Sequence, residues 1–302
     1  MPLVMLADAR ASMWVAPLAV AFATIVALPS TAEAFCRTSV CGEEASKVCT
    51  PAEDDDCGTA LFWGAPCFSF SLQEEGSSQV EVDTAEALMI QAFAAWENAD
   101  CGGVGPGISV DPYPRIGCDQ VEYNQEGGNA NLVVFRDDVW PYEGKGNTLA
   151  LTTVTFSLDT GEIFDADLEI NSTAAIDLTV GDGEVVYDLL SILTHEAGHM
   201  LGIAHSSVPG ATMTVEYVPG DTELRSLAPD DVAAICDAFP ANNAATCDPE
   251  PRHGFSEQCG GVTVDDGCGC STPGRATPVG GGWALVGLGL WLARRRCQTS
   301  GA

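Results

Sequence analysis

Basic residues are scarce in this chain of 302 residues. Lys and Arg number 12 against 43 Asp and Glu, which gives a formal net charge of −31 at pH 7. A protein of this charge would repel the phosphates of nucleic acid, so nucleic acid is excluded as a partner. Hydrophobic residues still make up 46% of the chain, enough for a packed core. The acidity therefore indicates the surface of a folded, exported protein and not a disordered chain.

Histidine is also scarce, and it is unevenly distributed. The chain has four histidines, and three of them fall in one short stretch, at His195, His199 and His205. Residues four apart lie on the same side of a helix, so His195 and His199 can reach one metal ion. Gly202 permits the positive φ that ends a helix, and the turn brings His205 back as a third ligand. Three nitrogen ligands with one open position are typical of catalytic zinc.

Glu196 follows the first histidine and projects toward that open position. Zinc lowers the pKa of a bound water to about 7 and polarises a peptide carbonyl. A carboxylate beside it can accept the water proton as a general base and then protonate the leaving amine as a general acid. Taken singly, a histidine pair can be a solvated helix face and a glycine only a helix cap. The full spacing favours the metal centre.

The segment after the third histidine reads Ser206-Ser207-Val208-Pro209-Gly210-Ala211-Thr212-Met213. It resembles the Met-turn of metzincin metallopeptidases, with the spacing of the matrixin branch. The resemblance implies that Met213 lies beneath the zinc as an apolar base, close to what an ordinary core methionine would do. Over residues 58–241 it also implies an α+β, zincin-like catalytic domain. Such a domain has a twisted, mostly parallel sheet, long helices and a small C-terminal subdomain.

The same resemblance implies the function of a zinc endopeptidase that acts on extracellular proteins as a monomer. An extended substrate would lie against an edge strand near residues 148–151, where Leu149 and Ala150 would bind its main chain. The loop over residues 214–226 would wall the main pocket, with Tyr217 and Pro219 shaping it. A noncatalytic surface or adhesion protein with the same fold is the alternative. A processing peptidase that acts on one partner is a second alternative.

The chain departs from animal matrixins in its metal ligands. No histidine precedes His195, so we expect no second, structural zinc, and Asp167 takes one of the positions where that zinc is held. The prodomain cysteine-switch sequence is absent as well. Calcium bound through Asp165, Asp167 or Glu169 is one interpretation of these acids. Solvated or capping carboxylates are the favoured one.

Hydrophobic periodicity predicts the elements of the domain. We expect strands over residues 62–72, 131–135, 148–158 and 161–171, and helices over residues 87–96, 187–200 and 229–239. Residues 83–86, Asp-Thr-Ala-Glu, are predicted to cap the first helix. The acids in the first turn of the last helix suit the helix dipole.

The cysteines indicate an oxidising compartment. Thirteen are present, ten of them between Cys36 and Cys259, and an exported chain with this pattern carries disulfides. Four crowd the N-terminal segment, residues 35–57, and are expected to staple it to itself or to the catalytic domain. A metal cluster is the alternative there, although no paired Cys-x-x-Cys spacing supports it. The pairing of the cysteines stays open.

The two ends of the chain indicate export. Residues 1–34 resemble a signal peptide cleaved after Ala34, or alternatively a membrane anchor. Residues 242–278 form a Cys, Gly and Pro-rich spacer, in which His253 is expected to be solvated. Residues 279–302 hold an apolar run closed by three arginines. With the preceding Cys-Gly-Cys they resemble the MYXO-CTERM sorting signal of myxobacterial exported proteins. This implies a sorting or processing peptidase as a partner and attachment at the cell surface, or release; a plain anchor is the alternative.

Overall fold

The computed structural model describes residues 35–40, 58–142, 148–241 and 247–260, all in the unit Glu33–Ala302. The predicted signal peptide and sorting signal, and most of the Cys-rich N-terminal segment, lie outside these residues. Among the helices in the described ranges, none is both long and apolar enough to cross a membrane.

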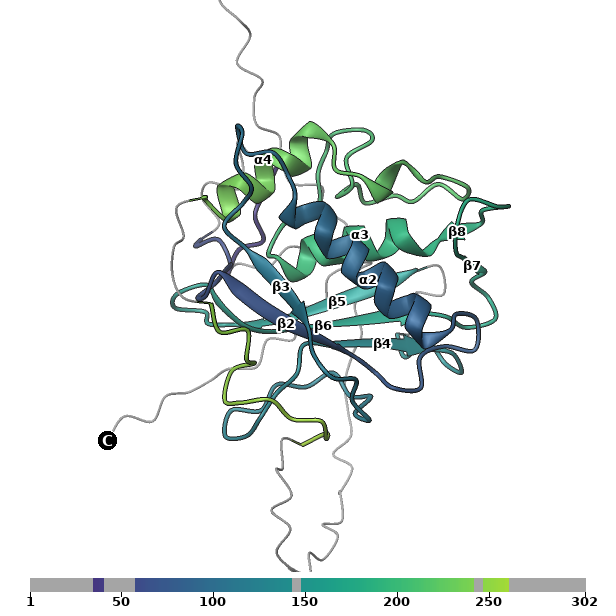
Figure 1. Ribbon diagram of the computed structural model, residues 1–302, viewed down its shortest axis with the longest axis horizontal. Helices are drawn as coiled ribbons and strands as arrows, with labels where there is room; N and C mark the ends of the chain where they lie inside the picture. The colour runs from purple at the N-terminus through teal and green to yellow at the C-terminus, as the bar shows by residue number, and fades with distance from the viewer. Residues whose placement is uncertain (1–34, 41–57, 143–147, 242–246, 261–302) are drawn as a thin grey trace, which may run out of the picture. The chain divides into compact units, whose positions relative to one another are not determined.

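A six-stranded sheet lies at the centre of this unit (Figure 1). Its strands are β1 (Phe62–Trp63), β2 (Cys67–Leu72), β3 (Ser109–Pro112), β4 (Leu132–Arg136), β5 (Ala150–Phe156) and β6 (Glu162–Asn171). Their order is β1-β6-β4-β2-β3, with β5 paired to β6. Only the β5–β6 pair is antiparallel, so the predicted mostly parallel sheet is confirmed. β5 pairs with β6 alone, so within the described chain its other edge is unpaired.

Two long helices, α2 (Val82–Glu97) and α3 (Leu189–Met200), cross one face of the sheet (Figure 1). Met89, Phe93 and Trp96 follow one another at helical spacing and are buried between the helices and the sheet. Burying each such side chain contributes about 1.5–3 kcal/mol. The indole Nε1 of Trp96 also donates to the carbonyl of Thr194 at 2.8 Å, which joins α2 to the middle of α3.

The shorter elements follow α3 or flank its start. The 3-10 helix η1 (Glu223–Arg225) precedes the last helix, α4 (Pro229–Ala238). Tyr187–Asp188 forms the strand β8, which pairs with β7 (Leu178–Thr179), so the helix predicted to begin at residue 187 begins two residues later. The strand predicted over residues 62–72 is interrupted between β1 and β2, where Pro66 has no N–H for a ladder hydrogen bond.

The predicted cap of α2 is wrong. The helix begins at Val82, and no side chain caps its first turn. Asp83 and Glu86 instead bind Arg115, at 2.7 and 2.6 Å. Since these carboxylates are engaged with a guanidinium from outside the helix, they are not available to the helix N–H groups.

The face of the sheet opposite the helices carries buried acids. Side chains along a strand alternate between faces. Ala166, Leu168 and Ile170 of β6 therefore join the core, and Asp165, Asp167 and Glu169 point the other way. Each of these three acids is only 2% exposed, so the expectation that they are solvated is wrong. They are covered because the chain also packs on this face: the N–H of Glu122, for example, donates to Asp167 at 3.1 Å.

The three acids differ in their partners. Glu169 pairs with Arg136 at 2.7 Å. Asp165 and Asp167 neighbour each other, and Asp167 accepts the Leu132 N–H at 2.8 Å. Burial raises the pKa of both aspartates. For Asp165, the nearby carboxylates of Asp167 and Glu122 raise the pKa further. For Asp167 the pKa rises to about 8.

This pair predicts a pH-dependent contribution to stability. A carboxyl with a higher pKa in the folded state stabilises the fold below its unfolded pKa and loses that contribution as pH rises through the folded value. We expect Asp165→Asn, which keeps the shape of the neutral side chain, to become increasingly stabilising relative to wild type as pH rises from about 4 toward neutrality. Urea unfolding of both proteins across this range measures the difference. The exposed Asp159→Asn is the control, and a difference independent of pH contradicts the prediction.

Three disulfides between described residues join distant parts of the chain, as the cysteine content predicts. They are Cys67–Cys247, Cys101–Cys236 and Cys118–Cys259, closing separations of 180, 135 and 141 residues. Two of them bring residues 247–260, which fall in the predicted spacer, against the sheet. There the Ser69 hydroxyl donates to the carbonyl of Pro249 at 2.7 Å.

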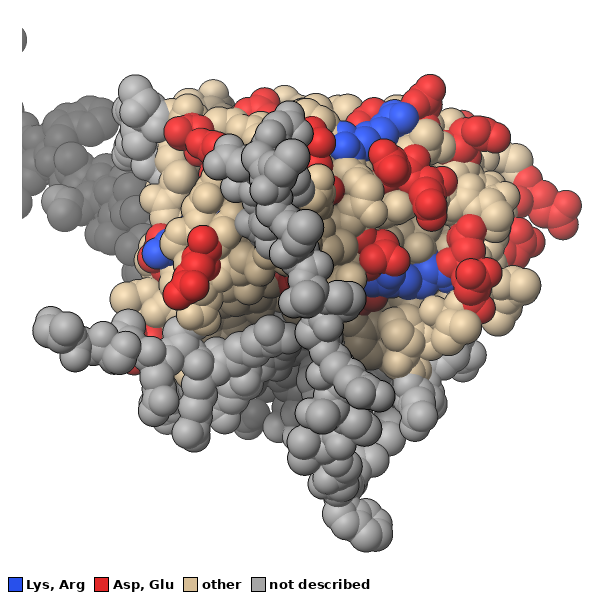
Figure 2. All heavy atoms as spheres, turned by 90° about the horizontal axis from the view of Figure 1, so that it is seen from below, with Lys and Arg blue, Asp and Glu red and all other residues tan. Residues whose placement is uncertain are grey.

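The surface carries the acids that the composition predicts. In Figure 2, Asp and Glu are spread over the described part of the visible face, and Lys and Arg form only small patches among them. His253 is exposed, as expected, and lies 3.1 Å from the hydroxyl of Tyr123.

Candidate metal centre and substrate cleft

Helix α3 positions the first two histidines. The residue before its start, Asp188, is the N-cap, and its carboxylate accepts the Ser191 N–H at 2.8 Å. At its other end the indole of Trp63 donates to the carbonyl of Met200 at 2.8 Å. The chain then turns at Gly202, where φ is +82° and an added Cβ would lie 3.3 Å from the carbonyl oxygen of Leu61. This tight turn directs the chain back toward His195 and His199.

The turn brings the three imidazoles together. The ring centroid of His195 lies 4.8 Å from that of His199 and 5.3 Å from that of His205, and the last two are 4.6 Å apart. The Nδ1 atoms of His195 and His199 lie 2.7 and 2.9 Å from the carbonyl oxygens of Thr212 and Ile203. With Nδ1 donating to these carbonyls, the Nε2 lone pairs face the shared space.

This donor set fits zinc. One candidate ligand atom from each histidine lies within 4.8 Å of the others, and the Nε2 atoms of His199 and His205 are 3.1 Å apart. Nitrogen ligands about 2.0–2.1 Å from a tetrahedral metal lie roughly 3.3 Å from each other. Burial lowers the pKa of His205 to about 3 and that of His199 well below its ordinary value. The imidazoles of His199 and His205 are therefore neutral, as metal ligands must be.

Glu196 lies at the edge of this centre. Its side chain is buried, and burial raises its pKa. The hydroxyl of Thr152, on β5, donates to its Oε2 at 2.6 Å. Sequence reasoning missed Thr152, because a threonine in a strand carries no signal for a partner 44 residues away.

The turn that ends at Met213 is held by the last helix. Met213 is buried, and Asp231 of α4 accepts the N–H groups of Thr212 and Met213 at 2.7 and 3.1 Å. Asp231 also accepts the Ala228 N–H at 2.8 Å, as an acid at this helix position often does. The sequence indicated only an interaction of this acid with the helix dipole, so its hold on the turn was missed.

Gly198, which has no side chain, lets α3 pack closely against Met213 and Trp96. An added Cβ would lie 2.3 Å from the Met213 sulfur and 2.7 Å from the Trp96 ring. Gly198→Ala should therefore lower the free energy of unfolding by about 1–3 kcal/mol, the usual effect of overpacking, although alanine favours helix. Denaturant unfolding measures this. Ala87→Gly, the reverse change at an exposed residue within α2, supplies the helix-propensity baseline. An alanine at residue 198 that stabilises the protein contradicts the prediction.

A cavity of ≈ 390 Å³ opens beside the histidines. All three histidines line it, together with Glu196, Leu149 and Ala150 on or beside the unpaired edge of β5, and Tyr217 and Pro219 of the following loop. Its remaining lining residues are Thr148, Leu151, Thr152, Tyr187, Ser191, Ile192, Thr214, Val215 and Leu224. The structure thus brings every predicted ligand and substrate-contacting residue to one cleft.

The fold and the cluster of three histidines define a candidate metalloprotein. Residues 120–239 match the matrixin family model. The chain is 36% identical to human matrilysin over 98 residues, covering 32% of this chain and 34% of matrilysin. It is 27% identical to matrix metalloproteinase-C of Caenorhabditis elegans over 187 residues, covering 59% of this chain and 29% of that protein. It spans about a third of the length of the relatives it matches.

Proposed function

We propose that this protein is an exported zinc endopeptidase that hydrolyses peptide bonds of extracellular proteins. The observation that carries the proposal is the single cleft where three histidine nitrogens face one another beside a buried carboxylate and an unpaired strand edge. The match of residues 120–239 to the matrixin family model supports the same function.

Each residue of the centre has a role in this proposal. His195, His199 and His205 hold the zinc, and the buried side chain of Met213 gives the site an apolar base. A zinc ion held there supplies a Lewis acid for the peptide carbonyl and makes a water molecule more acidic. Glu196 accepts the proton of that water and delivers it to the leaving amine. Thr152 holds the carboxylate of Glu196 in place for both transfers.

The substrate binds as an extra strand. The free edge of β5 lies beside Leu149 and Ala150, which line the cavity, and an extended peptide pairs with such an edge. Ile192, Val215 and Leu224 give the cavity an apolar part beside the histidines, which suits an apolar substrate side chain next to the scissile bond.

Other features expected from the sequence stay predictions. They are the signal peptide, the sorting signal with its processing peptidase, the monomeric state and the separate small C-terminal subdomain. Calcium stays a prediction too. A noncatalytic adhesion protein is the alternative function, and the intact set of three histidines and Glu196 argues against it.

Hydrolysis of a mixed peptide library by the purified exported protein tests the proposal. We expect cleavage that a zinc chelator abolishes and added zinc restores. A protein that binds zinc but cleaves neither peptides nor unfolded proteins would favour the noncatalytic alternative. Absence of zinc binding would refute the assignment of the centre itself.

A further inference from the structure

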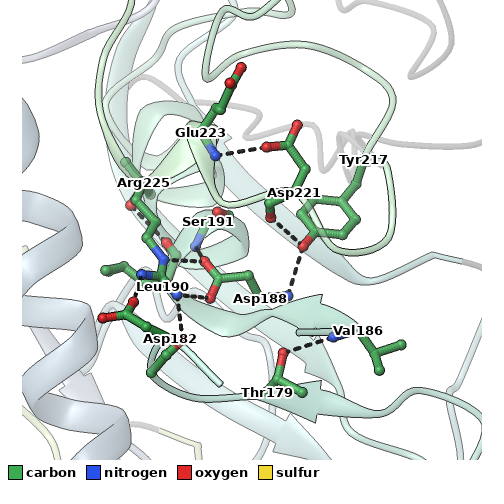
Figure 3. A network of polar contacts seen from close by, with 12 residues as sticks. Thr179, Asp182, Val186, Asp188, Leu190, Ser191, Tyr217, Asp221, Glu223 and Arg225 are labelled. Carbon is green, nitrogen blue, oxygen red and sulfur yellow. Dashed lines mark hydrogen bonds and ion pairs between the residues drawn. The ribbon is translucent and has the colours of Figure 1, made fainter. Parts of the chain in front are cut away.

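Asp188 connects three walls of the cavity (Figure 3). It caps α3 and is completely buried. Its carboxylate accepts two hydrogen bonds from Arg225 of η1, from Nε at 2.8 Å and from Nη2 at 2.6 Å. Its backbone N–H donates to the hydroxyl of Tyr217 at 2.9 Å. One residue therefore touches the start of α3, the helix η1 and the loop that holds Tyr217.

Arg225 extends these connections to a fourth segment. Its Nη1 pairs with Asp182 at 2.6 Å, and its Nη2 donates to the carbonyl of Gly181 at 2.6 Å. Tyr217 also donates its hydroxyl to the carbonyl of Asp221 at 2.6 Å, which closes its own loop. Figure 3 shows Arg225, Ser191 and Tyr217 meeting at Asp188.

The ion pair is of the strong kind. Two parallel hydrogen bonds from a guanidinium give a fixed geometry, and the Asp188 side chain is 1% exposed and that of Arg225 22%. Burial alone would raise the pKa of Asp188, but the hydrogen bonds from Arg225 and Ser191 hold it below its ordinary value. Removing one partner would leave a buried charge without compensation.

The residues next to this pair face the cavity. Leu224 precedes Arg225 in η1 and lines the cavity, and Ser191 and Ile192 line it from the first turn of α3. The pair thus joins two elements that both contribute side chains to the lining of the cavity. The distance between these walls sets the size of the side chain that fits.

We propose that the Asp188–Arg225 ion pair is a positioning device that sets the substrate selectivity of the cleft by fixing η1 and the Tyr217 loop against α3. The inference rests on the proposed peptidase function. With the pair intact, the walls cannot separate, and side chains larger than the cavity are rejected. Without it, η1 moves outward and the larger side chains enter.

The test compares three variants of the full chain with the wild type. Asp188→Asn keeps a good N-cap and removes the charge. The double variant Asp188→Asn with Arg225→Met removes both charges, so that no buried carboxylate is left unpaired. Arg115→Met is the matched control, because Arg115 also binds two carboxylates but does not line the cavity. Zinc content and thermal unfolding are measured for each variant.

Selectivity is measured in two ways. One is the kcat/KM for peptides with alanine, leucine or naphthylalanine at the residue that enters the cavity. The other is the Kd of peptide hydroxamates with the same three side chains, which requires no turnover. For each quantity, selectivity is the ratio between the values for the best and the largest side chain. We expect this ratio to fall by about tenfold in the Asp188 variants, the scale of one pocket contact. Arg115→Met should keep the wild-type preference.

The outcomes separate the two claims. If the wild type selects among the side chains and the Asp188 variants show the same selectivity as the wild type, the inference is wrong and the proposed function stands. A wild type that cleaves peptides without selecting among them also overturns the inference alone. A wild type that neither cleaves the peptides nor binds the hydroxamates refutes the proposed function and with it the inference.

Discussion

Glu196→Gln is expected to lower kcat by about 10²–10⁴-fold and to leave zinc content unchanged. Glutamine keeps the volume of the side chain, and its amide oxygen can still accept the hydrogen bond from Thr152. It cannot accept the proton of the attacking water, and general base catalysis contributes an effect of this size. Because the three histidines are untouched, the metal centre should stay intact.

Steady-state peptide hydrolysis and metal analysis on the same preparation check this result. Glu184→Gln, a change of the same kind at an exposed acid outside the cavity, is the control. A Glu196→Gln protein that has lost its zinc would make Glu196 part of the binding site for the metal. One that retains turnover within tenfold of wild type would assign the base to another residue.

Thr152→Val should lower kcat by about 10–100-fold with little change in KM. Valine has nearly the shape of threonine but lacks the hydroxyl that donates to Glu196 at 2.6 Å. A hydrogen bond to a charged group is worth about 1.5–3 kcal/mol, which corresponds to this range of rates. The loss falls on kcat because the hydroxyl orients the base and the cleft keeps its apolar lining.

Two variants sharpen this test. Thr152→Ser restores the hydroxyl and should recover most of the activity. Thr153→Val changes the next residue on β5, whose side chain points to the opposite face of the sheet, and should not lower kcat. Equal activity of Thr152→Val and wild type would mean that Glu196 is oriented without Thr152. A rise in KM alone would place Thr152 in substrate binding instead.

The wrong expectations about acidic side chains share one cause. Asp165, Asp167 and Glu169 were expected to be solvated, and Asp83 and Glu86 were expected at a helix cap. A charged side chain is solvated unless another segment covers or pairs it. Which segment does so depends on how the chain returns over the sheet, here through residues near Glu122 and through Arg115.

The sequence by itself determined the features that depend on local spacing. The ligands His195 and His199 lie one helical turn apart, and Gly202 supplies the turn. A continuous apolar run marks β4, and the alternation of apolar residues marks β6. These patterns follow from backbone geometry, so they can be read without knowing the fold. The content of disulfides follows from cysteine number in the same way, though their pairing does not.

Only the tertiary structure decided how the centre is supported. Thr152 reaches Glu196 across 44 residues, and Arg225 reaches Asp188 across 37. Asp231 holds the turn at Met213, and Gly198 clears space for Trp96. Each contact depends on how two separate elements pack. A hydroxyl, an acid or a glycine has the same local pattern whether or not such a neighbour exists, so the physical reason for these residues becomes visible only when the elements are packed together.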